Sequence, residues 1–234
     1  MRLDKYLADA GLGTRKEVQK LIAAGRVRID GRPVKNGGEQ VTGAVTYDGA
    51  PVAYVPALYA MMNKPEGVLT AARDRSAPTV EDFFPPLYLR RGVHPVGRLD
   101  KDVGGLLFLT DDGALNHRLT SPRYGVEKVY LARVDGVLNR SDVEAFARGL
   151  ALADFTALPA KLEILEPDLG RVTVCEGKFH QVKRMFQRVE KPVLCLRRIQ
   201  MGGVFLDEAL KPGEIRELSF DEIESLRRAA GMDG

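Results

Sequence analysis

The tetrapeptide Gly97-Arg98-Leu99-Asp100 is followed, three residues later, by the apolar run GGLLFLTDDG. An aspartate between a turn and a hydrophobic strand is expected to be half buried at a sheet edge. A carboxylate in such a partly dry site can act as a nucleophile or as a base. Position alone does not separate this role from that of a capping aspartate, which is the commoner use of a single Asp.

Two further segments bear on the role of Asp100. The run Glu127-Lys128-Val129-Tyr130-Leu131 alternates as a strand does and puts Tyr130 on one face. Residues 176–184, EGKFHQVKR, form a strand–turn–helix junction that is dense in cations. Together the two segments favour a functional interpretation of Asp100 over a capping one.

Several common chemistries lack their sequence patterns in this chain. There is no P-loop and no GxGxxG dinucleotide motif. Two cysteines, Cys175 and Cys195, and three histidines, His94, His117 and His180, show no zinc-ligand spacing, so we expect no metal. Both cysteines stand among apolar, β-branched residues and are predicted to be buried thiols.

The bulk composition is that of an ordinary globular protein. Of the 234 residues, 44% are apolar and 29% are charged, and the length allows one large domain plus a small one. No stretch approaches the ~18–20 apolar residues that a membrane span needs. The N-terminal MRLDKYLADA has no apolar signal-peptide core, so we expect a cytoplasmic protein.

The N-terminal segment predicts a helix, a turn, a second helix and a hairpin. A leucine stripe that stops at Gly11 indicates the first helix. Thr14 suits the cap of a second helix, which is predicted from Arg15 to about Ala24. Asp30–Gly31 is predicted to be the tight turn of the hairpin. A segment this small buries little core and is expected to be an accessory domain.

Positive charge is concentrated in this segment. Residues 1–43 hold nine Lys or Arg and five Asp or Glu, a net +4; because the whole chain carries +3, the remainder carries −1. Such asymmetry is typical of a nucleic-acid-binding appendage. The stretch RLDKYLADAGLGTRKEVQKLIAAGRVRIDGRPVKNG resembles the S4 RNA-binding domain. The cations expected to face RNA are Arg2, Arg15, Lys16, Lys20, Arg26, Arg28 and Lys35.

The remainder of the chain predicts a larger domain. Residues 44–58 are expected to supply a strand and a linker, and a domain over residues 59–234 follows. Strand-like runs (YAMMNKP, GLLFLTDD, EKVYLARV and RVTVCEG) alternate with amphipathic helices. Helices are predicted from Arg140 to about Leu150, from Gln181 to about Val189, and from Asp221. Hairpin-length or irregular gaps between the strands favour an α+β fold with a mixed, largely antiparallel sheet.

The segments at Asp100, Tyr130 and Lys183 resemble the core motifs of RsuA-type pseudouridine synthases, from about Tyr59 to the C-terminus. The resemblance implies that Asp100 is the catalytic aspartate, that Tyr130 packs against the target base, and that Lys183 pairs with the aspartate. It also implies that Arg98 helps to displace the target nucleotide. Further substrate-facing cations by the same resemblance are Arg123, Lys128 and Arg184, the last two with solvated surface as the alternative.

The implied reaction isomerises a uridine in small-subunit (16S) ribosomal RNA. The N1–C1′ bond breaks, the base turns, and C5 joins C1′, so no cofactor or metal is expected. The resemblance leaves open whether Asp100 adds to the base, attacks C1′ or removes a sugar proton. Lys183 would keep Asp100 ionised, because a nearby opposite charge favours the charged form. The uridine must leave its stack, and Tyr130 offers a ring to receive it.

A few positions depart from the family pattern or have a structural interpretation. The family commonly has a threonine where Val103 stands, and often an arginine where Gln200 stands. The first departure changes the support beneath Asp100, and the second puts one RNA or packing contact in doubt. His180 is expected to be a hydrogen-bonded structural histidine. The segment 62–67, MNKPEG, resembles a mainly structural motif of the family.

Three alternatives remain beside the 16S rRNA enzyme, which we expect to act on free rRNA or on the assembling small subunit as a monomer. The first is a related synthase that acts on 23S rRNA; the GKFHQVKRMF junction favours the small subunit. The second is a non-catalytic S4-type RNA-binding or assembly factor, which leaves Asp100, Tyr130 and Lys183 unexplained. The third is a metal-dependent hydrolase, but Asp111–Asp112 is better explained as a turn after a strand.

Overall fold

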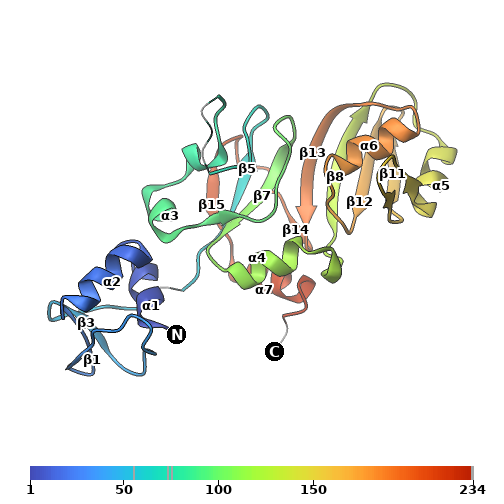
Figure 1. Ribbon diagram of the computed structural model, residues 1–234. Helices are drawn as coiled ribbons and strands as arrows, with labels where there is room; N and C mark the ends of the chain where they lie inside the picture. The colour runs from blue at the N-terminus through green and yellow to red at the C-terminus, as the bar shows by residue number, and fades with distance from the viewer. Residues whose placement is uncertain (55, 73, 75, 233–234) are drawn as a thin grey trace. The chain divides into compact units, whose positions relative to one another are not determined.

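The computed structural model describes residues 1–54, 56–72, 74 and 76–232 (Figure 1). Contacts divide the chain into two compact units. The first comprises Met1–Leu58 together with Phe84–His94, and the second comprises Tyr59–Phe83 and Pro95–Gly234. The first unit is therefore not continuous in sequence.

The first unit packs helices on a small antiparallel sheet. Its sheet has the strand order β2-β1-β3-β4. Thr14 and Glu17 form a reciprocal capping box at the start of the second helix, as the predicted cap requires. The elements are α1 (Leu3–Asp9), α2 (Arg15–Ala23), β1 (Val27–Ile29), β2 (Arg32–Pro33), β3 (Val45–Tyr47), β4 (Ala50–Pro51) and α3 (Pro86–Arg91).

Residues 44–51 are part of this small sheet. Strand β3 pairs with β1 in the register Val27↔Tyr47 to Ile29↔Val45, and β4 pairs with β3. Val45 is 2% exposed and belongs to the same apolar core as Leu3 and Ile22. The segment predicted as a strand and a linker thus extends the sheet of the small unit.

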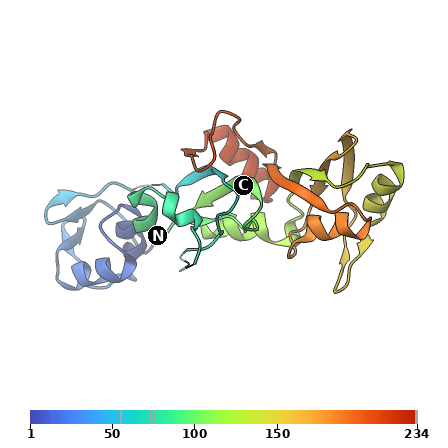
Figure 2. The same ribbon diagram turned by 90° about the horizontal axis from the view of Figure 1, so that it is seen from above.

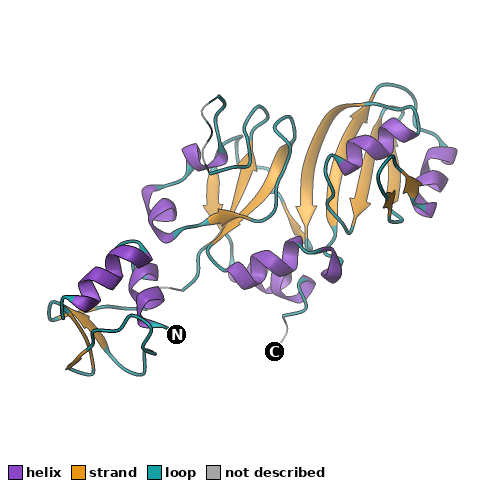
Figure 3. Cartoon of the chain, in the orientation of Figure 1, coloured by secondary structure: helices purple, strands orange, loops and turns teal. Residues whose placement is uncertain are grey.

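The second unit is built on one large mixed sheet (Figure 3). The strand order is β11-β12-β8-β13-β7-β5-β15, with β14 beside β13 and β6 beside β7. This arrangement confirms the predicted α+β class. The strands are β5 (Tyr59–Lys64), β6 (His94–Pro95), β7 (Gly104–Thr110), β8 (Lys128–Val134), β11 (Lys161–Glu166), β12 (Leu169–Val174), β13 (Val193–Met201), β14 (Val204–Phe205) and β15 (Ile215–Glu217), with a separate β9 (Leu150–Ala151) and β10 (Thr156–Ala157) pair.

The centre of the sheet depends on the close approach of β7 and β13. These two strands pair in parallel at Gly104 and Gly105, whereas β7 pairs antiparallel with β5 and β13 with β8. Gly105 has φ +100°, and a Cβ there would lie 2.2 Å from the carbonyl oxygen of Arg198. Only glycine fits this position.

Helices flank the large sheet. Helix α4 (Gly113–Thr120) lies beside α7 (Phe220–Ala229), as Figures 1 and 2 both show, and the core between them and the sheet includes Phe108 and Leu226. Helix α5 (Arg140–Arg148) packs on β11, and α6 (Gln181–Arg188) on β13. Short 3₁₀ turns, η1 (Val80–Phe83) and η2 (Pro122–Tyr124), lie in the connections. The predicted helices α5, α6 and α7 are confirmed.

One expectation in this unit gains a detail and another was wrong. The chain bends at Asp111 directly after β7, and the Asp112 side chain also accepts hydrogen bonds from the first backbone amides of α4 and caps that helix. Cys195 is exposed and Cys175 is only partly buried. Strand β13 shifts register between Val193 and Cys195, and this irregularity leaves Leu194 and Cys195 both exposed despite their apolar neighbours.

Candidate active site

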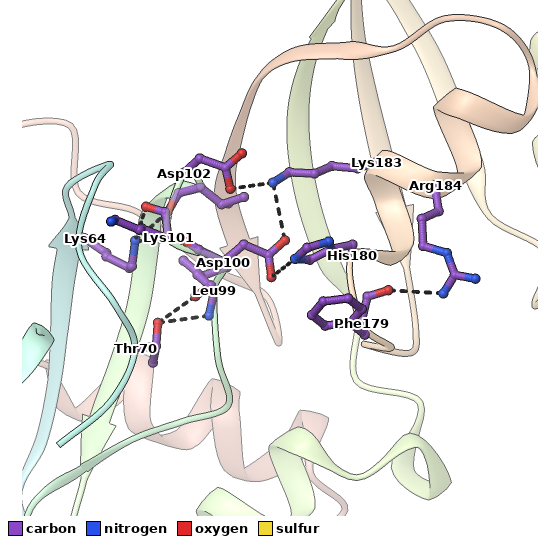
Figure 4. A network of polar contacts seen from close by, with 11 residues as sticks. Lys64, Thr70, Leu99, Asp100, Lys101, Asp102, Phe179, His180, Lys183 and Arg184 are labelled. Atoms are coloured by element: carbon purple, nitrogen blue, oxygen red, sulfur yellow. Dashed lines mark hydrogen bonds and ion pairs between the residues drawn. The ribbon is translucent and has the colours of Figure 1, made fainter. Parts of the chain in front are cut away.

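Asp100 lies in the loop that leads into β7, and this loop is fixed by its backbone. The ammonium group of Lys64, which is 1% exposed, donates hydrogen bonds to the carbonyls of Asp100 (3.1 Å) and Val103 (2.8 Å). The Thr70 hydroxyl donates to the Leu99 carbonyl (2.8 Å) and accepts from the Leu99 amide (3.1 Å). Figure 4 shows these two side chains approaching the loop. The position of Asp100 is thus set before any substrate binds.

Lys64 has an unusual electrostatic environment. Burial lowers its pKa to about 8, and the carboxylates of Asp102, Asp100 and Glu66 oppose this shift. From the sequence, the MNKPEG segment was predicted to be mainly structural, with no link to Asp100. In the structure, the Lys64 side chain of this segment supports the Asp100 loop.

The Asp100 carboxylate lies among charged groups of a different segment. Its side chain is 27% exposed, with Lys183 Nζ 3.5 Å from Oδ2 and His180 Nε2 3.5 Å from Oδ1. Lys183 also contacts Asp102 Oδ1 at 2.5 Å, and that hydrogen bond lowers the pKa of Asp102. The structure therefore brings Asp100 and Lys183 together, as the resemblance implied, and adds Asp102 and His180 to the group (Figure 4).

His180 occupies a special backbone position. It precedes α6 with φ 51° and ψ 27°, a left-handed conformation that non-glycine residues adopt rarely. Its imidazole faces the Asp100 carboxylate. The sequence predicted a hydrogen-bonded structural histidine, and the structure places its ring 3.5 Å from the Asp100 carboxylate.

Tyr130 lies in the middle of β8 and is 9% exposed. It is paired in register with Arg198 of β13 and Val172 of β12, so the sheet fixes its position from both sides. Tyr130 and Asp100 line the same small cavity, of about 70 Å³. An aromatic ring and a carboxylate at one cavity suit the recognition of a flat, polar base.

A larger hollow of about 560 Å³ adjoins the small cavity. Only the larger one includes Thr70, Lys101, Asp102 and Phe179 in its lining. The residues that line both are Arg98, Leu99, Asp100, Gly177, Lys178 and His180. The carboxylate thus stands where a small recess opens into a wider space.

Of three other predicted substrate-facing cations, Arg98 lines the cavities, and Arg184 and Arg123 do not. Arg98 is exposed and lines both cavities. Arg184 is ion-paired with Asp154, and its guanidinium lies 4.9 Å from the centre of the Phe155 ring. Arg123, on η2, is exposed but lines neither cavity.

Lys128 was predicted either to face the RNA substrate or to lie on the solvated surface, and it does neither. It is 6% exposed, and its ammonium group donates to the Val126 carbonyl at 2.8 Å. Burial, and then the charge of Arg198, lower its pKa to about 8. The side chain points into the protein because residue 128 falls on the buried face at the first position of β8, so its position matches neither RNA contact nor solvated surface.

The predicted RNA-facing cations of the first unit are all exposed. Arg2 and Arg15 form ion pairs with the buried Asp4, and Arg26 pairs with Asp48. The exposed set is Arg2, Arg15, Lys16, Lys20, Arg26, Arg28 and Lys35. Their exposure leaves positive charge on the surface of this unit.

The two departures from the family pattern have defined positions. Val103 is 2% exposed and lines the small cavity, and its carbonyl accepts the hydrogen bond from Lys64. Gln200 lies on β13 opposite Val129 and Phe205. In this chain the loop at Val103 is supported by Lys64 and Thr70.

Among the residues that the structure describes, no three His, Cys, Asp or Glu side chains group as ligands of a metal ion would. None of the described helices is long and apolar enough to cross a bilayer.

Two family models match the chain. Residues 58–188 match the model described as RNA pseudouridylate synthase, and residues 1–51 match the S4 domain. The first match contains Asp100, Tyr130 and Lys183, and the second contains the seven exposed cations of the first unit.

Similar proteins cover nearly the whole chain. An uncharacterized RNA pseudouridine synthase of Bacillus subtilis is 45% identical over 97% of this chain and 98% of its own length. The ribosomal small subunit pseudouridine synthase A of Pseudomonas aeruginosa is 42% identical over 97% of this chain and 100% of its own. A crystal structure of a pseudouridylate synthase is 38% identical with a TM-score of 0.69, covering 97% and 99% of the two chains.

Proposed function

The chain belongs to the RNA pseudouridylate synthase family, whose members are isomerases, and we propose that it converts one uridine of 16S ribosomal RNA to pseudouridine with Asp100 as the catalytic carboxylate. One observation carries the role of Asp100. Its carboxylate stands at a cavity that Tyr130 also lines, with Lys183 and His180 each 3.5 Å away.

The choice of small-subunit RNA is supported by the relatives. Proteins named ribosomal small subunit pseudouridine synthase A, from Pseudomonas aeruginosa and Escherichia coli, are 42% and 40% identical to this chain over 97% of its length. The GKFHQVKRMF junction was the reason to favour the small subunit from the sequence. We therefore propose that 16S rRNA, free or in an assembling subunit, is the partner, and that the protein works in the cytoplasm as a monomer.

The geometry suggests how the residues share the work. The target uridine leaves its stack and enters the recess, where its base lies against Tyr130. The Asp100 carboxylate attacks the nucleotide or removes a sugar proton, and the N1–C1′ bond breaks. The base turns, C5 joins C1′, and the C5 proton is lost while N1 gains one. Substrate and product are isomers, so we propose that no cofactor takes part.

Charge around the carboxylate supports this scheme. Lys183 and His180 approach different oxygens of Asp100, and Lys64 and Thr70 hold its loop by the backbone. The Lys183 ammonium group is a positive charge held beside the carboxylate. Preorganised charges of this kind do not have to rearrange during the reaction.

The proposal predicts a single new pseudouridine in 16S rRNA that depends on Asp100. Naked rRNA and assembling subunits are treated with wild-type protein, Asp100→Asn, or the control Asp135→Asn, whose side chain is exposed outside the cavities. Pseudouridine is mapped by carbodiimide modification and primer extension. We expect product with wild type and the control, and none with Asp100→Asn.

Each other outcome corrects a different part of the proposal. A site only in 23S rRNA would keep the chemistry and change the target. Product with Asp100→Asn would remove Asp100 from its catalytic role. No site in either rRNA, naked or assembling, would leave an S4-type RNA-binding protein whose second domain is silent or differently used.

A further inference from the structure

Phe179 presents an aromatic ring at the rim of the larger hollow. Its side chain is 74% exposed, and it lines the hollow that Asp100 also lines. One face of the ring stacks on the His180 imidazole, with 3.7 Å between ring centroids and 21° between planes. Figure 4 shows the two rings next to each other beside the Asp100 carboxylate. Exposure of a large aromatic ring leaves the remainder of its surface without an internal partner.

The ring is held in this position by a closed turn. The Gln181 side chain accepts a hydrogen bond from the Lys178 amide (3.0 Å), and the Gln181 amide donates to the Lys178 carbonyl (3.1 Å). Arg184 donates to the Phe179 carbonyl at 3.4 Å. The left-handed backbone of His180 completes the turn. An uncommon backbone conformation maintained by surrounding bonds points to a functional requirement for the ring's placement.

Exposed cations surround the ring. Arg98, Lys101 and Lys178 are exposed and line the same hollow, beside the carboxylates of Asp100 and Asp102. Exposed cations around an exposed aromatic ring are the arrangement with which proteins bind single-stranded nucleic acid. The backbone phosphates interact with the cations, and a base stacks on the ring.

We propose that Phe179 is a stacking platform for the base of a nucleotide that adjoins the target uridine in the substrate RNA. This inference rests on the proposed function. When the uridine turns out of the RNA stack, the neighbouring base loses a stacking partner. Phe179 replaces that partner at the mouth of the cavity, and so lowers the cost of displacing the uridine.

The first test compares substitutions of Phe179 with a matched control. Phe179→Ala and Phe179→Leu remove the aromatic face, whereas Phe179→Trp keeps it. Phe220→Ala removes a phenylalanine that is 75% exposed, at the start of α7, and lines neither cavity. One base–aromatic stack corresponds to about a 10-fold change in affinity. We expect about a 10-fold rise in KM for Phe179→Ala and Phe179→Leu, little change in kcat, and near wild-type values for Phe179→Trp and Phe220→Ala.

The second test removes the base instead of the ring. The substrate is an RNA fragment around the uridine that wild-type protein modifies, with an abasic nucleotide on its 5′ or its 3′ side. We expect one of the two abasic substrates to raise KM for wild-type protein by about 10-fold. With that substrate, Phe179→Ala should cause no further rise, because the stacking partner is already missing.

The two tests can overturn the inference without involving the target. If Phe179→Ala raises KM equally with intact and with both abasic fragments, or if Phe179→Leu behaves as Phe179→Trp does, the ring does not stack on a flanking base. The fragment comes from whichever rRNA is modified, so an error in the proposed rRNA changes the fragment and leaves the test of Phe179 intact. Thermal unfolding of each variant verifies that it is folded.

Discussion

Lys183 is shared between two carboxylates. Its ammonium group lies 2.5 Å from Asp102 and 3.5 Å from Asp100, while His180 approaches the second oxygen of Asp100. Asp102 is 73% exposed and holds the lysine from the solvent side, whereas Asp100 is 27% exposed. The contact with Asp102 therefore keeps the Lys183 ammonium group close to the Asp100 carboxylate.

At the residue scale, Lys64 gives a prediction about pH. Its pKa is about 8 in the folded protein against the ordinary 10.5, so between these values the unfolded chain binds more protons and stability rises with pH. Below pH 8 both states carry the charge, and its burial cost is fully present. Relative to Lys64→Met, the wild-type protein should gain roughly 1 kcal/mol of unfolding free energy between pH 7 and pH 9. Urea unfolding of both proteins across this range measures the difference.

The comparison with Lys64→Met isolates the one residue. Lys128 also has a pKa of about 8, but it is present in both proteins and its contribution cancels. Lys211→Met, an exposed lysine, serves as the control and should run parallel to wild type. A stability difference between wild type and Lys64→Met that stays constant or shrinks from pH 7 to pH 9 would contradict the buried-ammonium assignment.

The sequence predicted some of the site's residues and missed others for a physical reason. Asp100, Tyr130 and Lys183 were selected together by the resemblance to the RsuA-type family, and all three line one cavity. Lys64 was missed as a support because it acts on backbone carbonyls, which every residue has and no side-chain pattern reveals. The orientation of Lys128 was mistaken because alternation along a strand gives two faces without saying which one is buried.

At the element scale, the close approach of β7 and β13 predicts that one methyl group added at Gly105 strongly lowers the stability of the fold. Gly105→Ala would place its Cβ 2.2 Å from the Arg198 carbonyl oxygen at φ +100°. This clash is relieved only if β7 and β13 separate, so we expect a loss of about 3 kcal/mol or more of unfolding free energy. Chemical denaturation measures this loss.

Gly113→Ala is the matched control for that substitution. Gly113 begins α4, and a Cβ there would meet no atom within 4 Å. Alanine favours a helix over glycine by up to about 1 kcal/mol, so this variant should be as stable as wild type or slightly more stable. Equal stabilities of Gly105→Ala and Gly113→Ala would show that the strands tolerate wider spacing.

The elements themselves were predictable where a periodic pattern and a cap coincided. Helix α2 begins after Thr14 and α5 begins at Arg140, as their patterns indicated. Helices α3 and α4 were not predicted; α4 follows the acidic pair that was interpreted as a turn, although Asp112 caps it. The irregular register of β13, which exposes Cys195, depends on pairing with a strand far away in sequence. A local pattern contains no information about that pairing.

At the scale of the whole molecule, packing defines the two units. The helix and hairpin pattern predicted a small domain over residues 1–43 followed by a strand and a linker; β3 and β4 belong to the same sheet as β1, and residues 84–94 also join the first unit. Deletion of residues 1–43 would therefore remove β1, the partner of β3 in the sheet. Substitution of surface charges tests the electrostatic role of this unit without cutting its sheet.

The distribution of charge predicts how RNA binding responds to salt. Each RNA phosphate neutralised by a cation adds about 0.7 to 0.9 to the slope of log affinity against log salt concentration. The triple variant Lys16→Gln, Lys20→Gln, Arg28→Gln removes exposed cations of the first unit, so we expect the slope to fall by about 2 to 3. A control removes three exposed cations of the second unit, Arg140, Lys161 and Lys211, and should leave the slope nearly unchanged.

Filter binding of 16S rRNA fragments between low and moderate salt gives both slopes. Equal slopes for the two triple variants would mean that the first unit does not supply the main electrostatic attraction, and that the second unit binds RNA despite its net negative charge.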